Sequence, residues 1–96
     1  MDKRTELLDE EIAKVIELVG TKIDARLNEK HRGSYIGNHE TYGILAEEYK
    51  ELLDALQANQ SHSFCLELID IAVGAILGIA SMYANARTQS LEQENA

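Results

Sequence analysis

Three stretches of the chain space their apolar residues as α-helices do. The first covers about residues 5–30 and repeats apolar residues at steps of three and four, which predicts one inward-facing stripe: Leu8, Ile12, Val15, Val19, Ile23 and Leu27. The following segment, HRGSYIGN, contains two glycines and breaks the periodicity, as a loop does. A helix that packs along its whole length is therefore expected before residue 31.

The second and third stretches follow short loops. The second is expected at about 38–58, with Asn38 as its N-cap and an inward face made of Leu45, Tyr49, Leu52, Leu53 and Leu56. The third is expected at about 61–85, capped by Ser61 or Ser63. The remaining residues are polar and lack periodicity, so the sequence predicts a disordered tail at 88–96 after a single domain at 1–87.

The third stretch is apolar on nearly every side. Between residues 64 and 84 its plainly polar residues are Glu67, Asp70 and Ser81, and a helix of that kind must be surrounded. Gly74 and Gly78 leave a smooth strip for a neighbouring helix, which either belongs to the same chain or, as we prefer, to a second subunit. The expected fold is all-α, an antiparallel helical bundle. Its core is expected to be completed by homo-oligomerisation, because a single chain of 96 residues can form only a small hydrophobic core by itself.

Composition narrows the classes of function. A net charge of −8 argues against nucleic acid as a partner and is compatible with cation binding. One cysteine, Cys65, excludes an intramolecular disulfide, and the polar N-terminus lacks the core of a signal peptide, so a cytoplasmic protein is expected. The mainly apolar run 71–84, which contains no charged residue, is shorter than the roughly 20 residues of a membrane span, so no membrane partner is expected.

Two pairs of acidic residues suggest a chemical role. Glu48 and Glu51 share one face of the second helix, and Glu67 and Asp70 share one face of the third. If the helices are antiparallel neighbours, the pairs oppose each other, and each close pair of like charges costs on the order of 3 kcal/mol. To offset that cost, either some of the acids are protonated or a cation lies between them, and Mg²⁺ or Mn²⁺ is the expected cation because both prefer oxygen ligands. The alternative is a charged rim around a dimer seam, without any metal.

The two motifs together resemble those of a known family. EEYKE, a gap of fifteen residues and then ELID are similar to the E-E-x-x-E…E-x-x-D signature of the MazG-like, all-α nucleoside triphosphate pyrophosphohydrolases, over about residues 38–84. The resemblance implies an enzyme that hydrolyses (deoxy)nucleoside triphosphates to monophosphate and pyrophosphate, as a homodimer or homotetramer. It also implies that Mg²⁺ is held by four acids: Glu48, Glu51, Glu67 and Asp70. Glu47 would support them or orient water.

The chain departs from this family after the fourth acid. Many relatives continue into a helix whose Lys and Arg residues grip the phosphates, whereas here only Arg87 and a short tail follow. The grip is then expected from Arg87, Lys50 and Arg32, with Lys30 and His31 in the same loop as Arg32. A protein that binds nucleotides, or packs against a partner, without catalysis is the alternative function.

Overall fold

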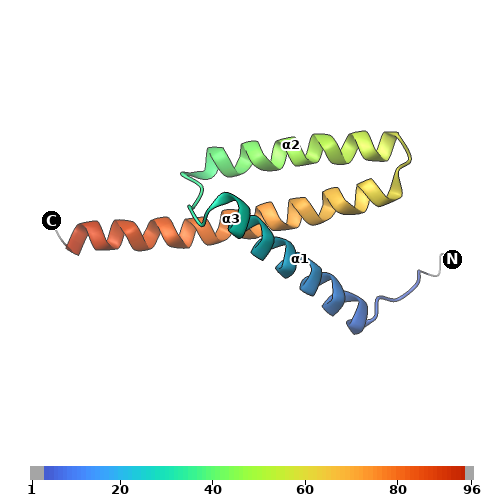
Figure 1. Cartoon of the computed structure of the whole chain (residues 1–96), viewed down its shortest axis with the longest axis horizontal. Coiled ribbons are helices and arrows are strands. Elements are labelled where there is room, and N and C mark those ends of the chain that lie inside the picture. The colour runs from blue at the N-terminus through green and yellow to red at the C-terminus, as the bar shows by residue number, and fades with distance from the viewer. Residues whose placement is uncertain (1–3, 95–96) are drawn as a thin grey trace.

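The computed structural model describes residues 4–94 and contains three helices within them (Figure 1). They are α1 (Asp9–Lys30), α2 (Asn38–Gln57) and α3 (Ser61–Glu94), of 22, 20 and 34 residues. The expected all-α class is confirmed. Helices α2 and α3 form an antiparallel hairpin, and α1 crosses α3 near its middle before diverging from the hairpin toward its own N-terminus (Figure 1).

The first helix begins and ends where its local chemistry changes. The backbone N–H of Leu8 donates to the Glu11 carboxylate at 2.9 Å, and three acids occupy the first turn, where the helix dipole favours negative charge. The start is thus Asp9 rather than residue 5. The helix ends before His31, whose φ of 80° is a backbone conformation that residues with a Cβ rarely adopt.

The turn between α2 and α3 is closed by backbone hydrogen bonds. Asn59 has a φ of 56°, and the amides of Asn59 and Gln60 donate to the carbonyls of Leu56 and Ala55, as in a Schellman motif. Two expected caps are wrong. Gly37 is the N-cap of α2, so Asn38 is already helical, and α3 begins at Ser61, with the Gln60 carbonyl accepting from the Phe64 amide.

The third helix is longer than the sequence indicated. Its expected end near residue 85 is wrong, because α3 continues through residues 86–94, so the segment 88–94 is helical. That segment contains no glycine or proline and is rich in strong helix formers, and polarity without a breaker does not end a helix. The last two residues of the expected tail lie outside the described residues, and the domain at 1–87 stays a prediction.

The glycine strip on α3 packs against α2 of the same chain. A Cβ added at Gly74 would lie 3.2 Å from Leu45 Cδ2, and one added at Gly78 would lie 2.5 Å from Thr41 Cγ2. The preference for a helix from a second subunit at this strip is therefore wrong. Because the glycines let α2 approach closely, the two acid-bearing segments of the hairpin are held side by side.

The first helix docks through its C-terminal half alone. Val19 is buried and Ile23 and Leu27 are half-buried, whereas Ile12 and Val15 are about half exposed. The expected continuous inward stripe is wrong for the N-terminal half, since that half points away from the hairpin (Figure 1). The inward face expected of α2 is likewise wrong in part, because three of its residues are exposed in this chain: Tyr49, Leu53 and Leu56.

The isolated chain exposes far more surface than a compact protein of its size. Its accessible surface is 8209 Å², against about 5,500 Å² for a folded monomer of 10.7 kDa. Its radius of gyration is 17.0 Å, against about 12.5 Å for a compact chain of this length. Helix α3 is long and apolar enough to cross a membrane by length and composition, although core helices pass the same test, and 17% of its most apolar window is buried. The apolar surface thus lacks cover within one chain.

Candidate functional site

The hairpin brings three of the predicted acids into one cluster. Glu48 on α2 and Glu67 and Asp70 on α3 each offer one carboxylate oxygen, and the three oxygens lie within 4.8 Å of one another. All three side chains are half-buried. We call these residues the carboxylate cluster. Their i, i+3 spacing on α3 and the close α2–α3 approach at the glycine strip explain why they meet.

The cluster contains buried oxygens that lack hydrogen bonds. Within residues 4–94, no donor bonds to Glu48 Oε2, Glu67 Oε2 or Asp70 Oδ1. A buried polar atom without a partner costs about 1–3 kcal/mol, and more when it is charged. Three convergent carboxylate oxygens with no sulfur or nitrogen ligand fit a hard divalent cation such as Mg²⁺ or Mn²⁺, which would satisfy them together.

Burial and mutual repulsion raise the pKa of two members of the cluster, Glu48 and Glu67. Burial, and then the nearby charges of Asp70 and Glu51, raise the pKa of Glu48 above 4.5. Burial also raises the pKa of Glu67, as do contact with Glu48 and the charges of Glu48 and Asp70. Glu48 and Glu67 are therefore harder to ionise in the metal-free protein, and a bound cation would reverse that preference.

The other two acids of the motif lie at the rim. Glu51 is exposed. Its pKa is raised first by a hydrogen bond with Glu67, in which the two carboxyl groups share a proton, and also by the negative charges of Glu67 and Glu47. Glu51 thus adjoins the cluster without belonging to the tight group of three. Glu47 is exposed as well, and its charge acts on Glu51. The structure places both acids where they can be reached from water.

Helix α1 brings two cations toward the cluster. Lys22 Nζ lies 3.6 Å from Asp70 Oδ1, and the charge of Arg26 lowers the pKa of Glu48, against the larger effect of burial. Neither residue was among the predicted site residues. Their spacing of four on the same helix as the apolar stripe was the available signal, but the side of the hairpin that α1 crosses cannot be inferred from spacing.

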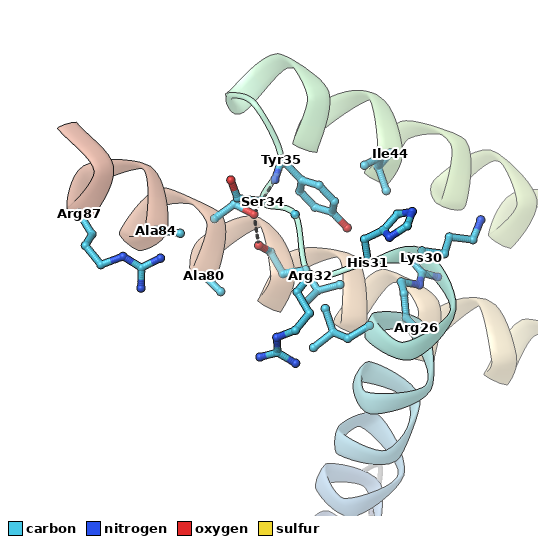
Figure 2. A pocket seen from close by; sticks show the side chains of 14 residues that line it. Arg26, Lys30, His31, Arg32, Ser34, Tyr35, Ile44, Ala80, Ala84 and Arg87 are labelled. Atoms are coloured by element: carbon cyan, nitrogen blue, oxygen red, sulfur yellow. Dashed lines mark hydrogen bonds between the residues drawn. The ribbon is translucent and has the colours of Figure 1, made fainter. Parts of the chain in front are cut away.

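Beside the carboxylate cluster lies a pocket of about 600 Å³ with a strongly basic lining. Figure 2 shows Arg26, Lys30 and His31 toward one end of it, Arg87 toward the other, and Arg32 between them. We call this cavity the basic pocket. Three of the four arginines of the chain line it, and within residues 4–94 no acidic residue does. In a protein of net charge −8 these side chains concentrate positive charge in one place, where it would attract anions.

The loop that bears Arg32 is tied to α3 by polar side chains. Ser81 is buried; its hydroxyl accepts from the Tyr35 amide at 2.9 Å and donates to the Leu77 carbonyl at 2.7 Å (Figure 2). Asn85 donates to the Tyr35 carbonyl and accepts from the Ser34 hydroxyl, both at 2.9 Å. These bonds fix the wall of the basic pocket. Ser81 stood out in the sequence as a polar residue in an apolar run, whereas Asn85 gave no signal.

The predicted phosphate-binding residues separate into two groups. Arg32 and Arg87, far apart in the sequence, line the same basic pocket together with Lys30 and His31. Lys50 does not line it; its side chain is exposed on α2. The pocket adjoins the cluster, because Ile44 in its lining lies one helical turn before Glu48, and Arg26 lines the pocket while acting on Glu48.

The raised pKa values predict how pH affects the metal-free protein. A carboxyl group whose pKa is raised by folding stabilises the fold fully below about pH 4.5, and this contribution is lost as pH rises through the raised value. A glutamine in place of Glu67 cannot ionise, so the Glu67→Gln variant keeps this stability at every pH. In EDTA, the melting temperature of the variant is expected to match that of wild type near pH 5 and to exceed it by roughly 2–5 °C at pH 8. Thermal melts across this range measure the difference.

The matched control for that experiment is Glu29→Gln, an exposed acid on α1 outside the cluster. The difference in melting temperature between this control and wild type should not grow with pH. If the difference between Glu67→Gln and wild type stays constant or shrinks as pH rises, the proposed repulsion is contradicted.

Comparison of the chain with protein-family models, with curated proteins and with solved structures gives no match.

Proposed function

We propose that this protein is a Mg²⁺-dependent hydrolase of (deoxy)nucleoside triphosphates that releases the monophosphate and pyrophosphate. The observation that supports it best is the juxtaposition of two unlike sites. Three convergent carboxylates with unpartnered oxygens lie next to a pocket lined by arginine and lysine. A metal-bound polyphosphate needs both: acids for the cation and bases for the phosphate oxygens. The similarity of EEYKE and ELID to the MazG-like motifs agrees with this function.

Each residue then has a defined part in the reaction. Glu48, Glu67 and Asp70 would hold the divalent cation, and Glu51 would complete the set from the rim. The cation would neutralise charge on phosphate oxygens and lower the pKa of water. Glu47, exposed to solvent, orients the attacking water. Water adds to the α-phosphorus and gives a proton to Glu47, the bond from that phosphorus to the bridging oxygen breaks, and pyrophosphate leaves while Arg26, Arg32 and Arg87 hold its oxygens.

We also propose that the protein works as a homodimer or homotetramer in the cytoplasm. The surplus of about 2,700 Å² of accessible surface over a compact monomer is what an obligate subunit interface buries. The exposed apolar residues that need cover lie on both α1 and α3: Ile12, Val15, Ile16, Ile76, Ile79 and Met82. A membrane is a poorer cover, because Glu67 and Asp70 lie on the same helix as that apolar surface.

Sedimentation equilibrium measures the assembly directly. We expect a mass of two or four chains of 10.7 kDa. Ile79→Asp, which puts a charge on an exposed apolar position of α3, should shift the mass toward the monomer. The control Lys14→Asp changes an exposed polar position and should not. A monomeric wild type at micromolar concentration contradicts this proposal.

The decisive experiment is pyrophosphate release from a panel of canonical and damaged (d)NTPs, with Mg²⁺ and with EDTA. Metal-dependent release supports the hydrolase and identifies its substrate. Nucleotide binding without release favours a non-catalytic nucleotide-binding protein. The absence of release, of binding and of any effect of Mg²⁺ on melting favours a helical interaction protein with a charged rim.

A further inference from the structure

Lys22 approaches the carboxylate cluster from outside the hairpin. Its ammonium lies 3.6 Å from Asp70 Oδ1, one of the buried oxygens that lack a hydrogen bond. The Lys22 side chain is 47% exposed, whereas that of Asp70 is 21% exposed. Lys22 is therefore a cation on a flexible stem at the edge of the cluster, held by charge attraction at a distance too long for a hydrogen bond.

Lys22 is also the first residue of a row of cations on α1. Lys22, Arg26 and Lys30 follow one another at steps of four, so they share one face of the helix. Lys22, at one end of the row, lies next to Asp70, and the charge of Arg26 acts on Glu48. Lys30, at the other end, lines the basic pocket. The row thus connects the site of a divalent cation with the site of an anion.

We propose that Lys22 is a substrate-binding residue that exchanges partners: it neutralises Asp70 in the metal-free protein and turns to the phosphate chain of a metal-bound triphosphate. This inference rests on the proposed function. A divalent cation that takes Asp70 Oδ1 removes the attraction for the ammonium and repels it. Phosphate oxygens on the same cation restore a negative partner within reach of the lysine stem. Because the Lys22 end of the pair is 47% exposed and makes no hydrogen bond to Asp70, the ammonium leaves it at little cost.

Two binding experiments without turnover test the exchange. Lys22→Met is titrated with Mg²⁺ alone, and then with inorganic triphosphate in saturating Mg²⁺, with calorimetry or thermal melting as readout. We expect Mg²⁺ alone to bind about threefold more tightly, because its competitor is gone. Triphosphate in Mg²⁺ should bind about tenfold more weakly, because a charge-assisted contact is lost. Lys22→Arg should keep triphosphate affinity within about threefold of wild type.

The opposite direction of the two changes is the signature. The control Lys14→Met removes an exposed lysine on the distal half of α1 and should alter neither affinity. If Lys22→Met weakens both ligands, the lysine merely holds the cluster in place and the inference is wrong; equal affinities in both titrations also overturn it. Wild-type protein that shows the exchange but releases no pyrophosphate overturns the proposed hydrolysis alone. A wild type that ignores Mg²⁺ overturns both.

Discussion

Asp70→Asn is expected to reduce Mg²⁺-dependent pyrophosphate release by on the order of 10³, the factor that corresponds to about 4 kcal/mol of lost transition-state stabilisation. The asparagine amide offers one neutral oxygen where the carboxylate offered two charged ones. Asp70 Oδ1 is buried and has no hydrogen bond, and one oxygen of Asp70 lies within 4.8 Å of oxygens from Glu48 and Glu67. The ratio of kcat/KM between variant and wild type, at saturating Mg²⁺, measures the loss.

The same variant should have the opposite effect on the metal-free protein. The Asp70 charge raises the pKa of Glu48 and Glu67, so its removal relieves repulsion inside the cluster. The ion pair with Lys22 is lost, but its ammonium is 47% exposed and lies 3.6 Å from the carboxylate oxygen, and such a pair contributes about 1 kcal/mol or less. In EDTA the melting temperature should rise by a few degrees, roughly 2–5 °C, and added Mg²⁺ should no longer raise it further.

Asp54→Asn is the matched control, since it removes an exposed acid from α2 outside the cluster. It should leave pyrophosphate release and the response to Mg²⁺ within about twofold of wild type, as surface substitutions commonly do. Equal activities of wild type and Asp70→Asn would mean that the acids form a charged rim and not a metal site.

Arg32→Gln combined with Arg87→Gln is expected to raise KM for the triphosphate by about 10²-fold. The two residues come from the α1–α2 loop and from α3 and line the same basic pocket. Each can form a charge-assisted hydrogen bond to a phosphate oxygen, and such a bond contributes about 1.5–3 kcal/mol, or roughly tenfold or more in affinity. Steady-state kinetics at several salt concentrations measure the change, and the salt dependence should become shallower in the variant.

Lys50→Gln distinguishes the basic pocket from a diffuse positive charge. The sequence suggested Lys50 as a phosphate-binding residue, but its side chain does not line the pocket. We expect the KM of the Lys50→Gln variant for the triphosphate to stay within about twofold of wild type. If KM rose in Lys50→Gln as much as in the double variant of Arg32 and Arg87, the phosphates would instead bind on the exposed face of α2.

Periodicity in the sequence predicts the helices well, because the apolar spacing of α2 and α3 reflects local geometry. The sequence also predicts that Glu48, Glu67 and Asp70 meet. Each helix of the hairpin has an i, i+3 pair of acids, and the short turn between the helices leaves few ways in which the two pairs can be placed. The ends of helices were less predictable. Residues 86–94 are polar yet helical, because propensity without a breaker outweighs the absence of an apolar stripe.

What could not be predicted depends on how α1 crosses the hairpin. The stripe from Leu8 to Leu27 has uniform helical spacing, yet only its C-terminal part packs on α3 in this chain. A crossing angle follows from side-chain shapes at the contact and not from periodicity. The positions of Lys22 and Arg26 at the cluster, and of Lys30 in the pocket, follow from that angle.

The shallow docking of α1 also sets an upper limit on affinity. Val19 is its one buried residue, so few contacts oppose its separation from the hairpin, and local opening of such an element requires little free energy. Every opening removes Lys22, Arg26 and Lys30 from the site. The measured dissociation constant of any ligand that needs them therefore equals the intrinsic constant divided by the fraction of molecules with α1 docked. Any contact that holds α1 in place, including one made by a second subunit, would tighten ligand binding without touching the ligand.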